Sequence, residues 1–230
     1  MATILHIETA TEVCSVALSI DNKLLMERVS DVDQSHSMLL GVFVEDIMVE
    51  IRKEDIQLDA VSVSSGPGSY TGLRIGVSQA KGLSYGLDIP LIAIPTPLVM
   101  AAQLQHEASE NSLLCPMIDA RRMEVYATFL DQNLKVVRQT SADIIEDNSY
   151  IDLLEKYEII FFGNGADKCK KVIKHPNARF IDGITPLASS MVTVANGAFA
   201  QNRFEDVAYF EPFYLKEFVA TVPKNKVLNI

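Results

Sequence analysis

The sequence has few cysteines and no long apolar run. Its three cysteines, Cys14, Cys115 and Cys169, lie far apart and form no C-x-x-C pair, which argues against a disulfide framework. No stretch approaches the roughly 20 apolar residues that cross a membrane, and no basic segment precedes an apolar core at the N-terminus. We therefore expect reduced thiols, no membrane association and a cytoplasmic location.

The sequence also lacks the usual catalytic motifs of hydrolases. Its four histidines form no H-x-x-x-H or H-E-x-x-H pair, and there is no G-x-S-x-G elbow; the histidines are His6, His36, His106 and His175. We interpret each histidine as structural or exposed. The sequence therefore predicts no catalytic residue and no metal site.

The charge is unbalanced toward acidic residues. Thirty Asp and Glu against 20 Lys and Arg give a formal net charge of −10. Such a chain repels phosphate at long range, so it is a poor candidate for holding a nucleic acid without help from other proteins.

What the sequence contains is a pattern of strands and helices that occurs twice. Its 230 residues, 48% of them hydrophobic, are enough for one large domain or two small ones. Three strands, a helix, a strand, a helix and a strand are predicted in residues 3–94, and the same order recurs more loosely in residues 113–181, followed by a last helix over 187–203. The fold class is α/β. We predict an N-terminal half (1–107) and a C-terminal half (108–230), and the last segment is a candidate for packing back onto the first half.

A glycine-rich segment, Gly66-Pro67-Gly68-Ser69-Tyr70-Thr71-Gly72, separates a predicted strand from a predicted helix. Free backbone N–H groups and the positive end of a helix favour an anion at such a place. The spacing matches neither the P-loop nor the dinucleotide fingerprint. Two interpretations stay open. The favoured one is a tight turn in which Thr71 caps the helix; the other is an anion site that uses Gly66, Gly68, Ser69, Thr71 and Gly72.

The helix predicted over Ser35 to Arg52 has two apolar stripes. One of them suffices for packing on a sheet; it contains Leu40, Phe43, Val44, Ile47 and Ile51. The second needs another surface, in this chain or on a partner; it contains Met38, Val42 and Val49, with Glu45 beside it.

The helix predicted over Thr71 to Tyr85 has one smooth face. Gly72, Gly76 and Ala80 recur at every fourth position, so another helix can approach that face closely. The approaching element belongs either to this chain or to a partner. The candidate interface therefore combines these three residues with Met38, Val42, Glu45 and Val49.

Two carboxylates occupy matching places in the two halves. Glu8 ends the first predicted strand, and Asp119 ends the strand that opens the second half. Together they could hold Mg²⁺ through water or activate a nucleophile, but we favour their role as turn caps, which acidic residues at strand ends usually have. Arg121 and Arg122 follow Asp119 closely enough to neutralise it or to meet a partner's acid.

Four motifs in this order give the chain a family resemblance that covers essentially its whole length. They are Ile7-Glu8-Thr9-Ala10-Thr11, the glycine segment continued to Gly76, Ile118-Asp119-Ala120-Arg121 with Glu124-Val125-Tyr126, and Glu211-Pro212-Phe213-Tyr214-Leu215-Lys216. The chain resembles the TsaB family, also called YeaZ. The extended glycine segment is the most specific of the four motifs.

The resemblance implies an actin-like (ASKHA) fold of two duplicated halves. It also implies a non-catalytic subunit that pairs with TsaD and helps recruit TsaE for threonylcarbamoylation of adenosine 37 in tRNA. The two N-terminal helices would form the contact with TsaD, or with a second copy of this chain when TsaD is absent. The subunit would have no cofactor of its own, ATP and magnesium would bind to partner subunits, and tRNA would be contacted only indirectly.

Two positions depart from the family pattern. Glu8 stands where the family usually has Asp, and Met123 where it commonly has a small residue. The longer acid weakens the case for independent ATP hydrolysis. Two alternatives are kept open: an actin-like ATPase or phosphotransferase that uses Glu8, Asp119 and the glycine segment, and a peptidase, as the older family label glycoprotease suggests.

Overall fold

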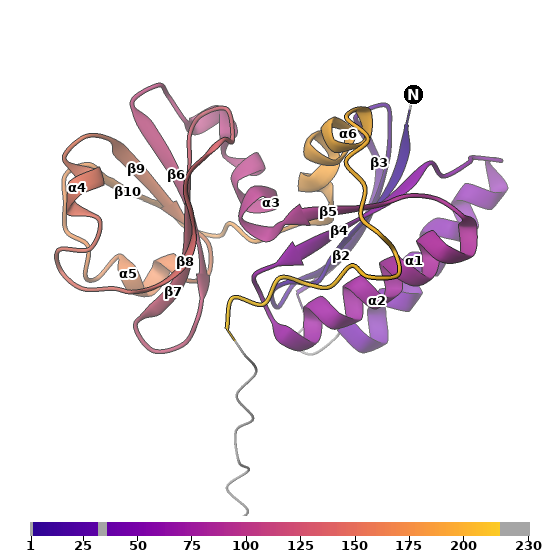
Figure 1. The fold of residues 1–230 in the computed structure, drawn as a ribbon, viewed down its shortest axis with the longest axis horizontal. Coiled ribbons are helices and arrows are strands. Elements are labelled where there is room, and N and C mark those ends of the chain that lie inside the picture. Colours follow the sequence, from indigo (N-terminus) through magenta and orange to yellow (C-terminus); the bar gives the residue numbers. More distant parts are fainter. Residues whose placement is uncertain (1, 32–35, 217–230) are drawn as a thin grey trace, which may run out of the picture.

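The computed structural model describes residues 2–31 and 36–216, which form two five-stranded sheets (Figure 1). The strand order is β3-β2-β1-β4-β5 in the first sheet and β10-β9-β6-β7-β8 in the second. Read from the other edge, the second order is β8-β7-β6-β9-β10, which repeats the first strand for strand. The duplicated actin-like layout expected from the sequence is therefore confirmed.

The first sheet contains the strands predicted in residues 3–94. Its central strand β1 pairs antiparallel with β2 and parallel with β4, and β5 lies beside β4. Asp21 and Asn22, between β2 and β3, both have positive φ, as a tight two-residue hairpin requires. The strands are β1 (Thr3–Glu8), β2 (Cys14–Ile20), β3 (Lys23–Ser30), β4 (Ala60–Gly66) and β5 (Leu91–Pro95).

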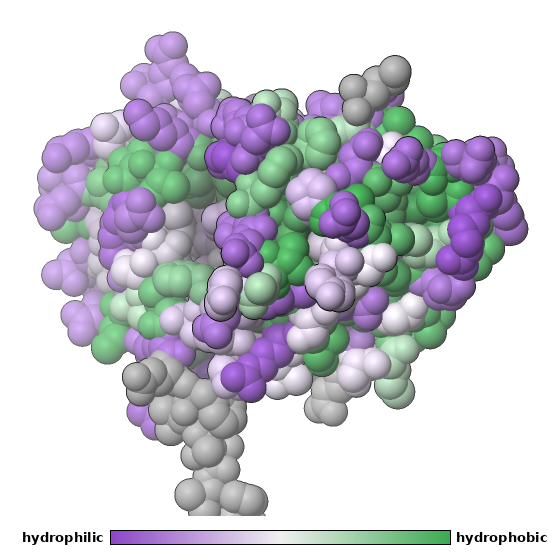
Figure 2. Space-filling view, turned by 45° about the vertical axis from the view of Figure 1, so that its right-hand side comes forward, coloured by the Kyte–Doolittle hydropathy of each residue, from purple (hydrophilic) through white to green (hydrophobic). Residues whose placement is uncertain are grey.

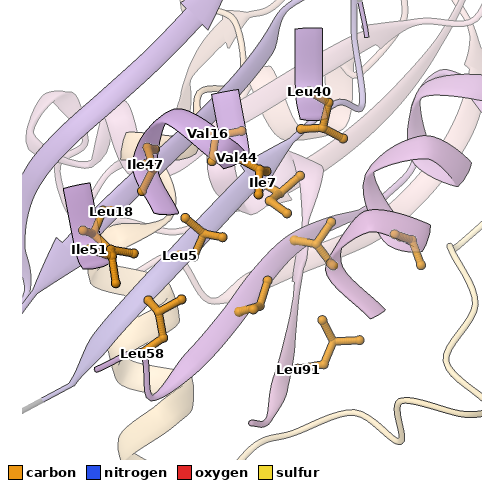
Figure 3. Close-up of a cluster of buried hydrophobic side chains, with 14 of the residues drawn as sticks. Leu5, Ile7, Val16, Leu18, Leu40, Val44, Ile47, Ile51, Leu58 and Leu91 are labelled. Atoms are coloured by element: carbon orange, nitrogen blue, oxygen red, sulfur yellow. The ribbon is translucent and has the colours of Figure 1, made fainter. Parts of the chain in front are cut away.

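Two long helices cover one face of this sheet. They are α1 (His36–Lys53) and α2 (Tyr70–Leu87), and Ser35, where the first was predicted to start, lies outside the described residues. Figure 3 shows the α1 side chains Leu40, Val44 and Ile47 among leucine, isoleucine and valine side chains of β1 and β2. Four of the five residues in the first predicted stripe are fully buried, and Phe43 is partly buried. Each fully buried aliphatic side chain contributes about 2 kcal/mol to this packing.

The second sheet has shorter helices and an aromatic core. Four rings are in contact one after another, with centroids 5.0, 6.0 and 5.1 Å apart: Phe129 meets Tyr150 edge to face, and Tyr150, Phe161 and Phe180 are stacked. The helix between β9 and β10 is a single turn, α5 (Ala166–Cys169). The other elements are β6 (Ser112–Asp119), β7 (Glu124–Leu130), β8 (Val136–Ile144), α4 (Ile151–Leu154), β9 (Glu158–Phe162) and β10 (Ala178–Ile181).

One helix was missed in the sequence. The sequence predicts a strand that Pro95 and Pro97 stop, and no helix directly after it, but Pro97 lies in the first turn of α3 (Thr96–Gln103). A proline there removes no helical hydrogen bond, because the first N–H groups of a helix have no partner inside it. The 3₁₀ turn η1 (Gln105–Glu107) follows and leads into the second half.

The last predicted helix packs on the first sheet. It consists of a 3₁₀ turn, η2 (Ala188–Met191), and α6 (Val192–Ala200). Met191, Ala195 and Ala198 share a buried cluster with Ile4 and Ile92 of the first sheet. The division between residues 107 and 108 stays a prediction. In the part of the chain that is described, no helix is long and apolar enough to cross a membrane.

Candidate functional site

The glycine segment and the start of α2 pack closely against the turn that follows β1. A Cβ atom at Gly68 would collide with the carbonyl oxygen of Ala10, one at Gly72 with the carbonyl oxygen of Thr9, and one at Gly76 with the hydroxyl of Thr9. Thr9 Oγ1 also donates a hydrogen bond to the carbonyl of Gly72 (2.8 Å). These three glycines are therefore explained by close packing inside the chain.

The start of α2 is capped by Ser69. Its side chain accepts a hydrogen bond from the backbone N–H of Gly72 (3.2 Å), and its own N–H donates to the carbonyl of Ala10 (2.6 Å). The prediction that Thr71 caps this helix is wrong, because α2 already begins at Tyr70. Two N–H groups that an anion would have used are thus engaged, and the anion site stays a prediction.

Glu8 is completely buried rather than turned toward open solvent. Its Oε1 accepts hydrogen bonds from the N–H of Ala10 (2.6 Å) and the hydroxyl of Ser64 (2.9 Å), and its Oε2 has no hydrogen-bond partner among the described residues. Burial raises the pKa of Glu8 to about 7, although these hydrogen bonds favour the charged form. The carboxylate holds the turn after β1, which is the favoured interpretation from the sequence.

Asp119 has a different environment. It is half exposed and forms an ion pair with Lys168, and its Oδ1 accepts a hydrogen bond from the backbone N–H of Arg121 (3.1 Å). Lys168, which the sequence did not single out, therefore neutralises this acid. Asn164 joins the two halves here: its Oδ1 accepts from the N–H of Asp119 (2.9 Å), and its Nδ2 donates to Glu12 (3.1 Å).

The histidine prediction is supported by His6. Its two ring nitrogens lie 2.7 Å from the hydroxyl of Ser62 and 2.8 Å from that of Ser19. Complete burial lowers the pKa of His6 to about 3, so the ring is neutral. Within residues 2–31 and 36–216, no group of three or more His, Cys, Asp or Glu side chains is placed to hold a metal ion.

The outward face of α1 is the open part of the predicted interface. Met38 is 70% exposed and Val42 is 52% exposed, whereas Val49 is partly buried. Glu45 is exposed and forms an ion pair with Arg52 (2.6 Å). Figure 2 shows hydrophobic residues exposed beside hydrophilic ones on the side of the molecule that carries α1 and α2.

The predicted face of α2 is not open. Gly72, Gly76 and Ala80 are buried inside the chain, so the interpretation of this face as a surface for a partner helix needs correction. A periodic pattern shows that three residues share a face but not what covers it. Two other helix glycines do have open space beside them: a Cβ atom at Gly41 of α1 or Gly82 of α2 would meet nothing within 4 Å.

Comparison with known proteins identifies relatives over most of the chain. A family model described as TsaD, tRNA N6-adenosine threonylcarbamoyltransferase, matches residues 30–224. The tRNA threonylcarbamoyladenosine biosynthesis protein TsaB of Escherichia coli K12 is 30% identical over 94% of this chain and 96% of its own length. The protein of the same name from Bacillus subtilis 168 is 29% identical over 75% of each chain.

Solved structures agree on the fold. YeaZ from Pseudomonas aeruginosa superposes with a TM-score of 0.74 at 22% identity, over 94% of this chain and all of that one. A structure described as an uncharacterized protein with similarity to peptidase YeaZ from Pseudomonas aeruginosa reaches a TM-score of 0.80 at 23% identity, with the same coverage.

Proposed function

This chain belongs to the TsaB family of tRNA threonylcarbamoyladenosine biosynthesis proteins, and we propose that it serves that pathway as a non-catalytic scaffold. It pairs with TsaD and helps recruit TsaE, and the transfer of the threonylcarbamoyl group to tRNA takes place on TsaD. ATP and magnesium bind to the partner subunits. The net charge of −10 is in keeping with tRNA being held mainly by other subunits.

The observation that carries the proposal is the outer surface of α1 and α2. Met38 and Val42 present apolar side chains to solvent, one helical turn apart. These side chains are not needed for packing on the sheet, because the opposite stripe of α1 already fills that contact. An exposed apolar stripe that continues toward charged residues such as Glu45 is typical of a surface that another protein covers.

The exposed glycines support the same surface. A glycine inside a helix costs about 1 kcal/mol relative to alanine, and Gly41 and Gly82 gain no close contact in return within the described chain. A partner helix that packs closely on α1 and α2 would use the space above them. About 800 Å² per partner is needed for a stable interface, which two helix faces can supply.

The acidic residues support a role without chemistry of its own. The Glu8 carboxylate is enclosed by the turn that it holds, and Asp119 is paired with Lys168. Neither side chain is placed as a free base beside an open substrate site.

The proposal is tested by placing a charge on the predicted interface. Val42→Glu should abolish co-purification with TsaD and lower threonylcarbamoyladenosine formation in a reaction reconstituted from purified subunits. Val137→Glu is a matched control, because Val137 is 51% exposed but lies on β8 in the other half. The expected result is loss of pairing for Val42→Glu alone.

Two outcomes would contradict the proposal. One is Val42→Glu pairing with TsaD at the yield of the unaltered chain, which would remove α1 from the interface. The other is tRNA modification that proceeds equally well without this chain, which would remove the scaffold role itself. Sedimentation velocity of the chain alone, with and without Val42→Glu, shows whether the same surface forms a homodimer.

A further inference from the structure

The motif Glu211-Pro212-Phe213-Tyr214-Leu215-Lys216 is not used by the proposed function, and its position is distinctive. After α6 the chain runs along α2 and reaches the space between the two halves (Figure 1). We call residues 204–216 the strap. It begins against the first sheet, because the N–H of Glu205 donates to the carbonyl of Leu91 at the edge of β5 (2.9 Å).

The first part of the strap is fastened to α2. Lys81 donates hydrogen bonds to the carbonyls of Ala208 (3.2 Å) and Phe210 (2.9 Å). The side chains of Val207 and Phe210 pack against the core beneath α2. These contacts bring the chain to the start of α2, where the motif lies.

Phe213 is 48% exposed and lies at the cavity between the two sheets. Its N–H donates to the carbonyl of Ser65 (2.7 Å), and its own carbonyl occupies space that only a glycine at position 66 leaves free, since a Cβ there would lie 2.6 Å away. Phe213 is one of the residues that line a cavity of about 360 Å³. Residues of both halves line the same cavity, among them Leu98 of α3 and Leu130 of β7.

The next residues contact both halves within a short stretch. The ring of Tyr214 lies 4.8 Å from that of Tyr70, and its hydroxyl accepts a hydrogen bond from Arg74 Nε (3.3 Å). The guanidinium carbon Cζ of Arg74 lies over the Tyr70 ring, 4.2 Å from its centroid. Lys216 then forms an ion pair with Glu124, the first residue of β7 in the second half.

We propose that residues 213–216 are a clasp that fixes the two halves relative to each other and ties the start of α2 to the second sheet. The chain passes from the first sheet to the second through α3 and η1 and returns between β10 and η2. A further tether at the start of β7 restricts rotation about these two connections. The clasp is independent of the partner assignment, because every contact in it lies within this chain. Its release would widen the cavity and loosen residues 65–70 and the start of β7 together.

The test measures the geometry between the halves in the full-length protein. Spin labels at Tyr85→Cys in α2 and Val137→Cys in β8 report the distance between halves, and the three native cysteines are buried and unsuited to labelling. The unaltered strap should give one narrow distance distribution. Phe213→Ala combined with Lys216→Ala should broaden or shift it. Tyr209→Ala, an exposed residue of the same strap, is the matched control and should leave it unchanged.

Hydrogen exchange gives a second measurement that does not depend on labels. In the Phe213→Ala, Lys216→Ala variant, backbone exchange should rise several-fold in residues 65–70 and 124–126, and stay unchanged in α1. Lys216→Ala alone changes a surface residue, so folding is retained, and adding Glu124→Gln to it should have no further effect on exchange in residues 124–126. An unchanged distance distribution, or faster exchange confined to the strap itself, would overturn the clasp.

Discussion

Replacing Glu8 with glutamine is expected to change how the stability of this protein depends on pH. Burial raises the pKa of Glu8 from an ordinary value of 4.5 to about 7, against the opposing effect of hydrogen bonds from Ala10 and Ser64. Between these two pH values the unfolded chain has released the proton and the folded chain still holds it. The free energy of unfolding therefore falls as the pH rises through this window. The shift corresponds to about 3 kcal/mol.

Glutamine retains a carbonyl oxygen for the N–H of Ala10 and has no proton to release. Glu8→Gln should therefore resemble the unaltered protein near about pH 4.5 and exceed its stability by about 3 kcal/mol above about pH 8. His6 acts in the opposite direction, because its lowered pKa makes stability fall on acidification below 6.5. Both proteins contain His6, so its effect cancels in the difference between them.

Urea unfolding at several pH values between about 4.5 and 8.5 measures that difference. Glu110→Gln is the control, since it removes a glutamate from an exposed position and should show a much smaller pH-dependent difference. A stability difference between Glu8→Gln and the unaltered protein that is the same at every pH would refute the conclusion that folding keeps Glu8 protonated.

Two further predictions concern α2 and His6. Gly76→Ala should destabilise the chain by about 1–3 kcal/mol, because the new methyl group overlaps the hydroxyl of Thr9. Adding Thr9→Ala should restore part of this loss. Gly82→Ala, in open space on the same helix, should instead stabilise the chain by about 0.5–1 kcal/mol. Thermal unfolding measures both, and equal effects at the two glycines would contradict the packing argument. In the unaltered protein, the neutral His6 should make the free energy of unfolding fall by about 1.4 kcal/mol per pH unit on acidification from 6.5 toward 4. His6→Gln should remove this fall. An unchanged pH slope in urea unfolding would show that His6 is not held neutral.

Part of the candidate site could be predicted from local pattern. A β-rich run, an alternating run and the turn signal at Asp21-Asn22 placed β1, β2 and β3 within a residue or two, and the helical period identified the buried stripe of α1. The exposed stripe with Met38 and Val42 was visible in the same way. Periodicity works there because burial of a regular element depends mainly on which side chains share one face.

The glycines show where that reasoning stops. Gly72 and Gly76 have a helical spacing that suits a partner helix, but in the fold they lie under Thr9, which is more than 60 residues away in sequence. The missed helix α3 has a related cause. A proline can stop a strand or occupy the first turn of a helix, and the structure around it decides which. Pro97 lies in the first turn of α3.

The amino-acid sequence by itself determined the duplicated order of strands and helices, the absence of common hydrolase motifs and the apolar character of the outer face of α1, because these depend on residue type and spacing along one element. The tertiary structure decided which faces are open, that Glu8 is enclosed, and that the C-terminal motif reaches the second half. Those properties depend on contacts between residues distant in sequence. The spacing of residues within one helix or strand does not indicate which other parts of the chain will pack against it.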